Sequence, residues 1–207
     1  MPGIVIPNSV RFGSDEHVAQ GASSPQGDLP VLIMVAAGGR ASVENHWHGV
    51  DKILKLAALT IGKLNYIVIG NEKVEELNPP SNVRVVSRVS PDDLIDLYEQ
   101  ADIAFGTLAL HRKDMNEACP FKVREALSCG LPVILGYIDT AFVGEEIPPW
   151  VLEIPNVEKN LMNFESEILN FCKEWHGRRV LVSEVKPFID SQIIESKKLD
   201  FLKSLCN

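Results

Sequence analysis

Residues 116–134 read NEACPFKVREALSCGLPVI. The stretch contains two glutamates, Glu117 and Glu125, that are eight positions apart. Because proline is favoured at helix starts, we expect Pro120 to open a helix, with Glu117 on the preceding loop and Glu125 about a turn and a half inside the helix. An apolar run at 131–135 follows and predicts a buried strand. Two carboxylates around a helix N-terminus are typical of a ligand site.

Upstream, the pattern alternates between strands and helices. Apolar runs of strand length are typical of strands buried on both faces of a parallel sheet. They predict strands at 31–37, 65–70, 83–86, 102–107, 131–135 and 150–154. Helical spacing predicts one helix at 50–61 and a second after Ser90, which has the N-cap, proline and acidic residues of a helix start. The predicted fold is α/β, a Rossmann-like doubly wound parallel sheet that binds ligands at the carboxyl ends of its strands.

The chain turns helical beyond Pro155. One apolar face predicts a single long helix over 161–175. Gly177 and Pro187 are then expected to interrupt the helical structure. An amphipathic terminal helix is expected at 190–205.

Composition excludes several classes of protein. A net charge of −8 over 207 residues and a pI near 5.2 give no general attraction for nucleic acid. No apolar run approaches the ~20 residues needed to cross a bilayer, and the basic start of a signal peptide is missing. The four cysteines have no metal-ligand or CxxC spacing, so we expect reduced thiols, no metal site and a cytoplasmic protein.

Two loops are expected to converge on the ligand site. Gly38 and Gly39 follow the first strand and permit close approach of an anion, while Arg40 supplies a guanidinium suited to phosphate. Lys122 lies in the first turn of the helix that begins near Pro120, where free amides also favour an anion. A plain turn with a solvated arginine remains the alternative for residues 38–40.

The paired acids suggest a sugar ligand. A carboxylate accepts hydrogen bonds from two vicinal hydroxyls, which both ribose and hexose present. We therefore expect Glu117 and Glu125 to flank a nucleotide sugar, one at each sugar ring. The alternative is that Glu117 is a helix-start charge and Glu125 a surface residue.

These motifs together resemble a known family. The E-x7-E pair followed by Glu-Ala-Leu-x-x-Gly-Leu-Pro-Val is similar to the donor-binding half of group 1 retaining glycosyltransferases of the GT-B fold. The stretches 46–52 and 110–113 resemble a bacterial subset with Trp-His-Gly-x-Asp and His-Arg-Lys. The resemblance covers 30–154, and it implies an interdomain linker at 1–29, a nucleotide-sugar-binding domain at 30–176, and helices at 177–207 that pack back on a missing N-terminal half.

The resemblance also implies roles for single residues. Glu117 would be catalytic, holding the transferred sugar near the reacting centre, and Glu125 would bind the donor ribose. Arg40, with Gly38 and Gly39, would contact the diphosphate. His48 stands where the family has a phosphate-binding lysine, which makes the charge there dependent on pH near ~6.5; Lys122 would compensate.

The implied activity is transfer of a hexosyl group from a UDP-, GDP- or ADP-sugar with retention, without a metal. The chain alone would be an inactive half, and the full enzyme would serve polysaccharide synthesis in the cytoplasm, at the inner face of the membrane or in peripheral association with it. Two other classes stay open: a non-catalytic nucleotide-binding or interaction domain, and an epimerase relative acting on nucleotide sugars. Also open is whether His46, Trp47, Arg112 and Lys113 are structural or contact the ligand.

Overall fold

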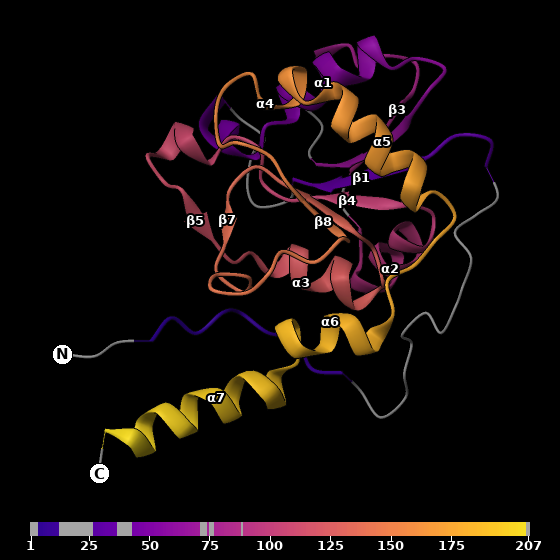
Figure 1. Cartoon of the computed structure of the whole chain (residues 1–207). Coiled ribbons are helices and arrows are strands. Elements are labelled where there is room, and N and C mark those ends of the chain that lie inside the picture. The colour runs from indigo at the N-terminus through magenta and orange to yellow at the C-terminus, as the bar shows by residue number, and fades with distance from the viewer. Residues whose placement is uncertain are drawn as a thin grey trace.

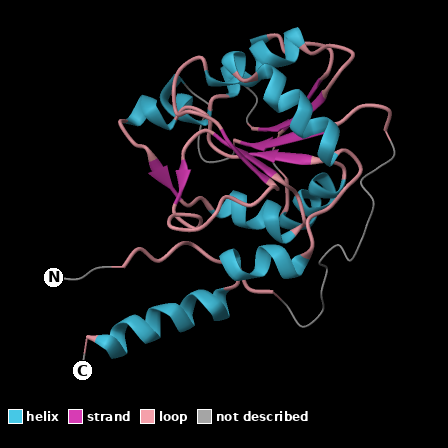
Figure 2. Cartoon of the chain, viewed as in Figure 1, coloured by secondary structure: helices cyan, strands magenta, loops and turns pink. Residues whose placement is uncertain are grey.

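The computed structural model describes residues 4–12, 27–36, 43–70, 74, 77–87 and 89–205. Its centre is a six-stranded sheet in the order β3-β2-β1-β4-β6-β8, in which all neighbouring strands are parallel (Figures 1 and 2). This confirms the predicted Rossmann-like fold. The strands are β1 (Val31–Val35), β2 (Asn65–Ile69), β3 (Val83–Val86), β4 (Ile103–Phe105), β6 (Val133–Leu135) and β8 (Val151–Glu153).

Helices cover both faces of the sheet. Figure 1 shows α1, α4 and α5 on one face and α2 and α3 on the other, and α6 packs on α3. Both faces of the central strands are therefore buried, which explains their continuous apolar sequence. The helices are α1 (Val50–Leu59), α2 (Pro91–Glu99), α3 (Phe121–Ser128), α4 (Asn160–Asn163), α5 (Glu165–Trp175), α6 (Val182–Ile189) and α7 (Ser191–Ser204).

The helical C-terminal region departs from the prediction at two points. The single helix expected over 161–175 is wrong: α4 ends and α5 begins at Phe164, whose φ of −114° and ψ of 20° leave the helical region. Pro187 was expected to interrupt the chain but lies inside α6. A proline removes one backbone hydrogen bond, and a surface helix of eight residues accommodates that loss.

A second, two-stranded sheet was not predicted. It pairs β5 (Glu117–Ala118) with β7 (Ile138–Asp139) in parallel. Because β5 follows β4 in the chain and β7 follows β6, this ribbon lies at the edge where the strands of the main sheet end (Figure 1). That edge is the ligand-binding edge of a doubly wound sheet.

Val10, in the first described segment, pairs with Asp190 at the junction of α6 and α7. The Val10 amide donates to the Ile189 carbonyl at 2.8 Å, and the Ser191 amide donates to the Val10 carbonyl at 2.9 Å. From this bridge α7 extends away from the body of the molecule (Figure 1). The first described segment instead reaches the start of α3, where the Asn8 amide donates to the Cys119 Sγ at 3.1 Å. None of the helices in the described part of the chain is long and apolar enough to cross a membrane.

Candidate functional site

Lys122 and His48 meet at the carboxyl end of β1. Lys122 comes from the first turn of α3, and His48 ends the 3-10 helix η1 (Val43–His48). The Lys122 Nζ donates to the Val35 carbonyl at 2.9 Å and lies 3.2 Å from the His48 Nδ1. The residue predicted to replace the family's lysine and the lysine predicted to compensate are therefore in direct contact.

The environment changes how both groups titrate. Burial, reinforced by the neighbouring charges of Lys122 and Lys113, lowers the pKa of His48 to about 3. The prediction that His48 carries a pH-dependent charge near neutrality is therefore wrong, because the imidazole is held among cations in a partly buried position. Burial lowers the pKa of Lys122 to about 7. The charge that responds to pH at this position belongs to Lys122.

The two glutamates lie on exposed surface on either side of the start of α3. Glu125 is on α3, as predicted. Glu117 is not on an irregular loop: it lies in β5, opposite Ile138 of β7. The correction follows from pairing with a strand that is 21 positions away, which local sequence does not reveal. Gly38, Gly39 and Arg40 follow β1 but lie outside the described residues.

The N-terminus of α3 is not capped by a side chain. Pro120 occupies its N-cap position with φ of −73° and ψ of 139°. The first amides of a helix have no partner within it, and the helix dipole adds positive potential at this end. The start of α3 can therefore hold an anionic group beside Lys122.

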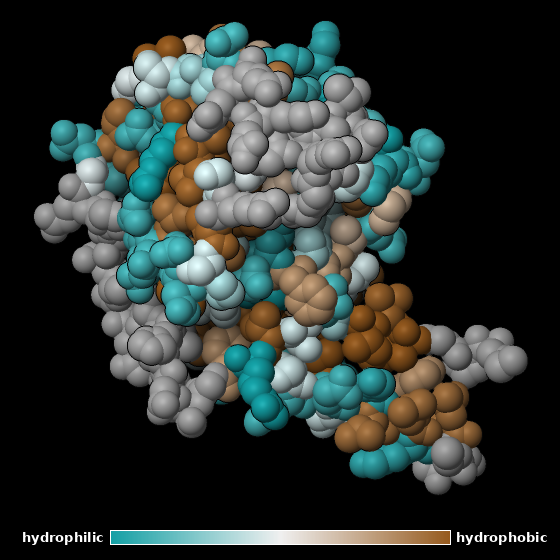
Figure 3. Space-filling model, turned by 180° about the vertical axis from the view of Figure 1, so that it is seen from behind, coloured by the Kyte–Doolittle hydropathy of each residue, from teal (hydrophilic) through white to brown (hydrophobic). Residues whose placement is uncertain are grey.

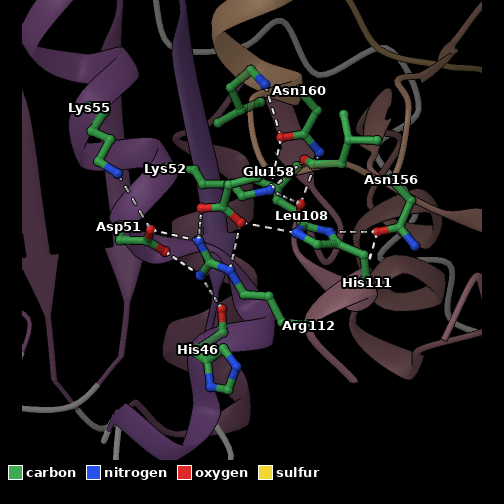
Figure 4. Close-up of polar contacts among 12 residues, drawn as sticks. His46, Asp51, Lys52, Lys55, Leu108, His111, Arg112, Asn156, Glu158 and Asn160 are labelled. Atoms are coloured by element: carbon green, nitrogen blue, oxygen red, sulfur yellow. Dashed lines mark hydrogen bonds and ion pairs between the residues drawn. The ribbon is translucent and has the colours of Figure 1, made fainter. Parts of the chain in front are cut away.

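Arg112 forms the centre of an ionic network at the same edge (Figure 4). It lies in η3 (Leu110–Lys113) and makes paired bonds to the Asp51 carboxylate, at 2.8 and 2.9 Å. It also donates to the His46 carbonyl at 2.8 Å and to both carboxylate oxygens of Glu158. All five guanidinium N–H donors are thus in use. Arg112 is a structural clamp between η1, α1 and the segment after β8.

Neighbouring side chains extend this network. The His111 Nδ1 and backbone amide both face the Asn156 Oδ1, while its Nε2 lies 3.0 Å from the Glu158 carboxylate. Lys52 is buried, and its Nζ donates to the carbonyls of Leu108 and Val157 and to the Asn160 Oδ1. Sequence reasoning missed Asn156, Glu158 and Asn160. Their position directly after a strand of the predicted sheet was the available signal.

Trp47 is a packing residue with a charged neighbour. The Lys113 ammonium lies 3.2 Å from the centroid of the Trp47 ring. The Trp47 ring centroid is 5.4 Å from that of His48. Lys113 is thereby placed near the site that contains His48 and Lys122. The sequence had left open whether Lys113 is a solvated loop charge, and the structure gives it this cation–π contact.

The cysteines in the described part of the chain form no disulfide. Cys119, Cys129 and Cys172 are free thiols, and Cys206 lies outside the described residues. Within the ranges that the structure describes, no group of three or more His, Cys, Asp and Glu side chains is arranged to hold a metal ion.

The chain forms a parallel doubly wound sheet with a lysine at the end of β1 and two carboxylates around a later helix, and sheets of this class bind ligands at the carboxyl ends of their strands. The chain belongs to the family of group 1 glycosyl transferases, whose model matches residues 28–143, more than half of its length. The family resemblance seen in the sequence is thereby confirmed. No curated protein matches the chain.

Solved structures show the same fold. A sucrose-phosphate synthase from Thermosynechococcus elongatus aligns with 97% of this chain at 17% identity and a TM-score of 0.59. The apo form of the lipopolysaccharide outer core galactosyltransferase WaaB aligns with 97% at 14% identity and a TM-score of 0.66. Anabaena HepE, in complex with UDP and glucose, aligns with 84% at 16% identity and a TM-score of 0.55. The chain spans 52%, 56% and 48% of these three proteins, about half of each.

Proposed function

We propose that this chain is the donor-binding, C-terminal half of a GT-B glycosyltransferase, which transfers a hexosyl group from a nucleoside diphosphate sugar with retention. The observation that carries the proposal is the position of Lys122. Its ammonium contacts a carbonyl and a neutral imidazole at the uncapped start of α3, and no carboxylate pairs with it among the described residues. An anion is the ligand that would complete this environment.

The two glutamates fit the sugar rings on either side of such an anion. In the proposal Glu125 binds the ribose and Glu117 the transferred sugar, and Arg40 with Gly38 and Gly39 completes the diphosphate site. The α3 amides and Lys122 stabilise the charge that develops on the leaving diphosphate, in place of a metal. The complex of HepE with UDP and glucose supports this ligand class through the shared fold.

An apolar surface supports the existence of a partner half. Exposed apolar residues gather at the start of the described chain and on α7, and Figure 3 shows their brown surface at the lower right. They are Ile4, Val5, Leu199, Leu202 and Leu205. Solvent-exposed apolar clusters mark interaction sites. We propose that the N-terminal half of the enzyme covers this surface, and that the complete enzyme works in polysaccharide synthesis on the cytoplasmic side, at the membrane surface.

A second candidate function is nucleotide binding without turnover. The neutral His48 favours it, since a permanent cation is lost where the family has a lysine. Measuring product formation after adding the partner half separates the two: binding without any transferred sugar would support the non-catalytic domain.

The proposed donor site predicts selective nucleotide binding by this chain. Calorimetric titration with UDP, GDP, ADP and their glucose conjugates should show one preferred base. Glu125→Ala should weaken binding of that nucleotide about tenfold or more, because a pair of charge-assisted hydrogen bonds to the ribose is lost. Glu99→Ala, which removes an exposed glutamate from α2, is the matched control and should bind normally. Equal affinity of both variants would contradict the assignment of Glu125.

Donor binding should also depend on pH through Lys122. A bound diphosphate favours the protonated amine of Lys122. In the free protein this amine has a pKa of about 7, so above pH 7 it must take up a proton when the diphosphate binds. Affinity for UDP-glucose should therefore be about fivefold weaker at pH 8 than at pH 7. UDP-glucose is the better probe because its diphosphate has no terminal ionisation near neutrality.

Lys122→Arg is the control for this pH effect. Arginine stays protonated throughout this range, so the variant should bind UDP-glucose with nearly constant affinity from pH 6.5 to pH 8.5. The same pH profile in both proteins would show that the proton goes elsewhere.

A further inference from the structure

A buried ion pair joins the ribbon that carries Glu117 to helix α3. The Arg124 Nη2, from α3, donates to the Asp139 Oδ2, from β7, and both side chains are fully buried. Asp139 also accepts the Ala141 amide at 3.0 Å through its Oδ1. The pair therefore fixes the end of β7 against the helix.

The pairing of β5 with β7 gives Glu117 a second connection to α3. β7 is held on β5 by the Ile138 amide, which donates to the Asn116 carbonyl at 2.9 Å, and by the Thr140 amide, which donates to the Ala118 carbonyl at 3.2 Å. From β5 the chain passes through Cys119 and Pro120 directly into α3. Glu117 is thus connected to the helix both along the chain and through the Arg124–Asp139 pair.

Stability alone does not account for this pair. The Nε and Nη1 groups of Arg124 are buried and have no hydrogen-bond partner among the described residues. Unpaired buried donors are costly, and apolar residues of similar volume often stabilise a protein as well as a buried ion pair does. The ion pair instead fixes the position of β7 along α3: it holds the Asp139 carboxylate at Arg124, the residue directly before Glu125.

We propose that Arg124 and Asp139 are positioning residues, which hold Glu117 at a fixed distance from the start of α3 and thereby set the preference for a sugar nucleotide over the free nucleotide. The inference rests on the proposed function, because it assigns the sugar to Glu117 and the ribose to Glu125. The pair acts through β7 and β5 and does not touch the ligand.

The test compares UDP with UDP-glucose, and GDP and ADP with their glucose conjugates, by calorimetry on the whole chain. The unaltered protein should bind the glucose conjugate about tenfold more tightly than the matching nucleotide. Arg124→Met combined with Asp139→Leu removes both charges and leaves no buried ion alone. This double variant should keep its nucleotide affinity within about twofold and lose the preference for the conjugate.

A second set of variants separates positioning from a general structural role. Glu117→Gln should abolish the same preference, and adding it to the double variant should change nothing further, because residues acting through one contact are not additive. If the double variant does not fold, Arg124→Lys decides, because it keeps a cation opposite Asp139 but changes the geometry of the pair, and it should lose part of the preference.

The outcomes distinguish this inference from the donor site itself. A folded double variant that retains the tenfold preference overturns the positioning role, and so does additive loss with Glu117→Gln. An unaltered protein that binds a nucleotide without preferring its conjugate also overturns it but leaves the nucleotide site standing. A protein that binds none of the six ligands overturns both proposals.

Discussion

Replacing Arg124 alone by methionine should destabilise the protein by about 3–5 kcal/mol, because it leaves the Asp139 carboxylate buried without its cation. For a domain of this size that corresponds to a fall of roughly 6–20 °C in the unfolding temperature. Thermal and denaturant unfolding measure the effect. Arg84→Met is the matched control, since Arg84 is exposed and makes one hydrogen bond to Gln100, and it should change stability by less than about 0.5 kcal/mol.

The cost of Arg124→Met should depend on pH. Burial already raises the pKa of Asp139, and the charge of Arg124 is the largest influence that opposes this rise, ahead of the hydrogen bond from the Ala141 amide. Without the arginine, the folded state binds a proton that the unfolded state releases near its ordinary pKa of ~3.9. Stability of the variant should therefore fall as pH rises above about 4, relative to the unaltered protein. A loss that is the same at pH 5 and pH 7.5 would mean that Asp139 escapes to solvent.

Gly49→Ala should also lower the free energy of unfolding strongly, by about 2–5 kcal/mol. Gly49 has a φ of +81°, a conformation that costs an alanine roughly 1–2 kcal/mol. Its added Cβ would lie 2.8 Å from the Leu108 Cβ. Leu108 cannot withdraw easily, because its amide donates to the His48 carbonyl and its own carbonyl accepts from Lys52. Overpacking of this kind typically adds 1–3 kcal/mol.

Gly62→Ala separates strain from the clash. Gly62 has a similar φ of +76° but no atom within 4 Å of the added Cβ, so it should lose only about 1–2 kcal/mol. Denaturant unfolding measures the stability loss of each variant, and the difference between the two losses is the cost of the clash with Leu108. Because Gly49 directly follows His48, its variant should also weaken UDP-glucose binding, whereas Gly62→Ala should not. Equal stability losses in the two variants would show that the loop at Leu108 yields.

The sequence predicted the architecture because the signals for strands and helices are local. The buried strands appear in the sequence as short apolar runs. The start of α2 has the N-cap Ser90, the proline and the acidic first turn that the sequence predicts. The break at Phe164 and the continuation of α6 through Pro187 were not predicted, because tertiary packing, which for α6 is against α3 and α7, overrides local sequence patterns.

The candidate site was predicted as a set of residues, without the contacts between them. The sequence indicated Lys122, His48 and both glutamates, because a helix start and its charges are neighbours in the chain. Lys122 and His48 are 74 positions apart in the sequence, and the fold brings them into contact. Burial there lowers the pKa of both side chains, so that Lys122 and not His48 titrates near neutral pH. Arg112 was expected to be solvated or to contact a ligand, and the network shows all of its donors in use.

By itself, the sequence determined the alternation of strands and helices, the parallel sheet and the placement of two carboxylates around one helix, because each depends on side chains within a few turns of one another. Only the tertiary structure decided that Glu117 lies in a paired strand, that Arg124 and Asp139 hold that strand to α3, and that Lys122 lies beside a neutral imidazole. These features depend on which strand ends become neighbours in the sheet, and burial there sets the charges.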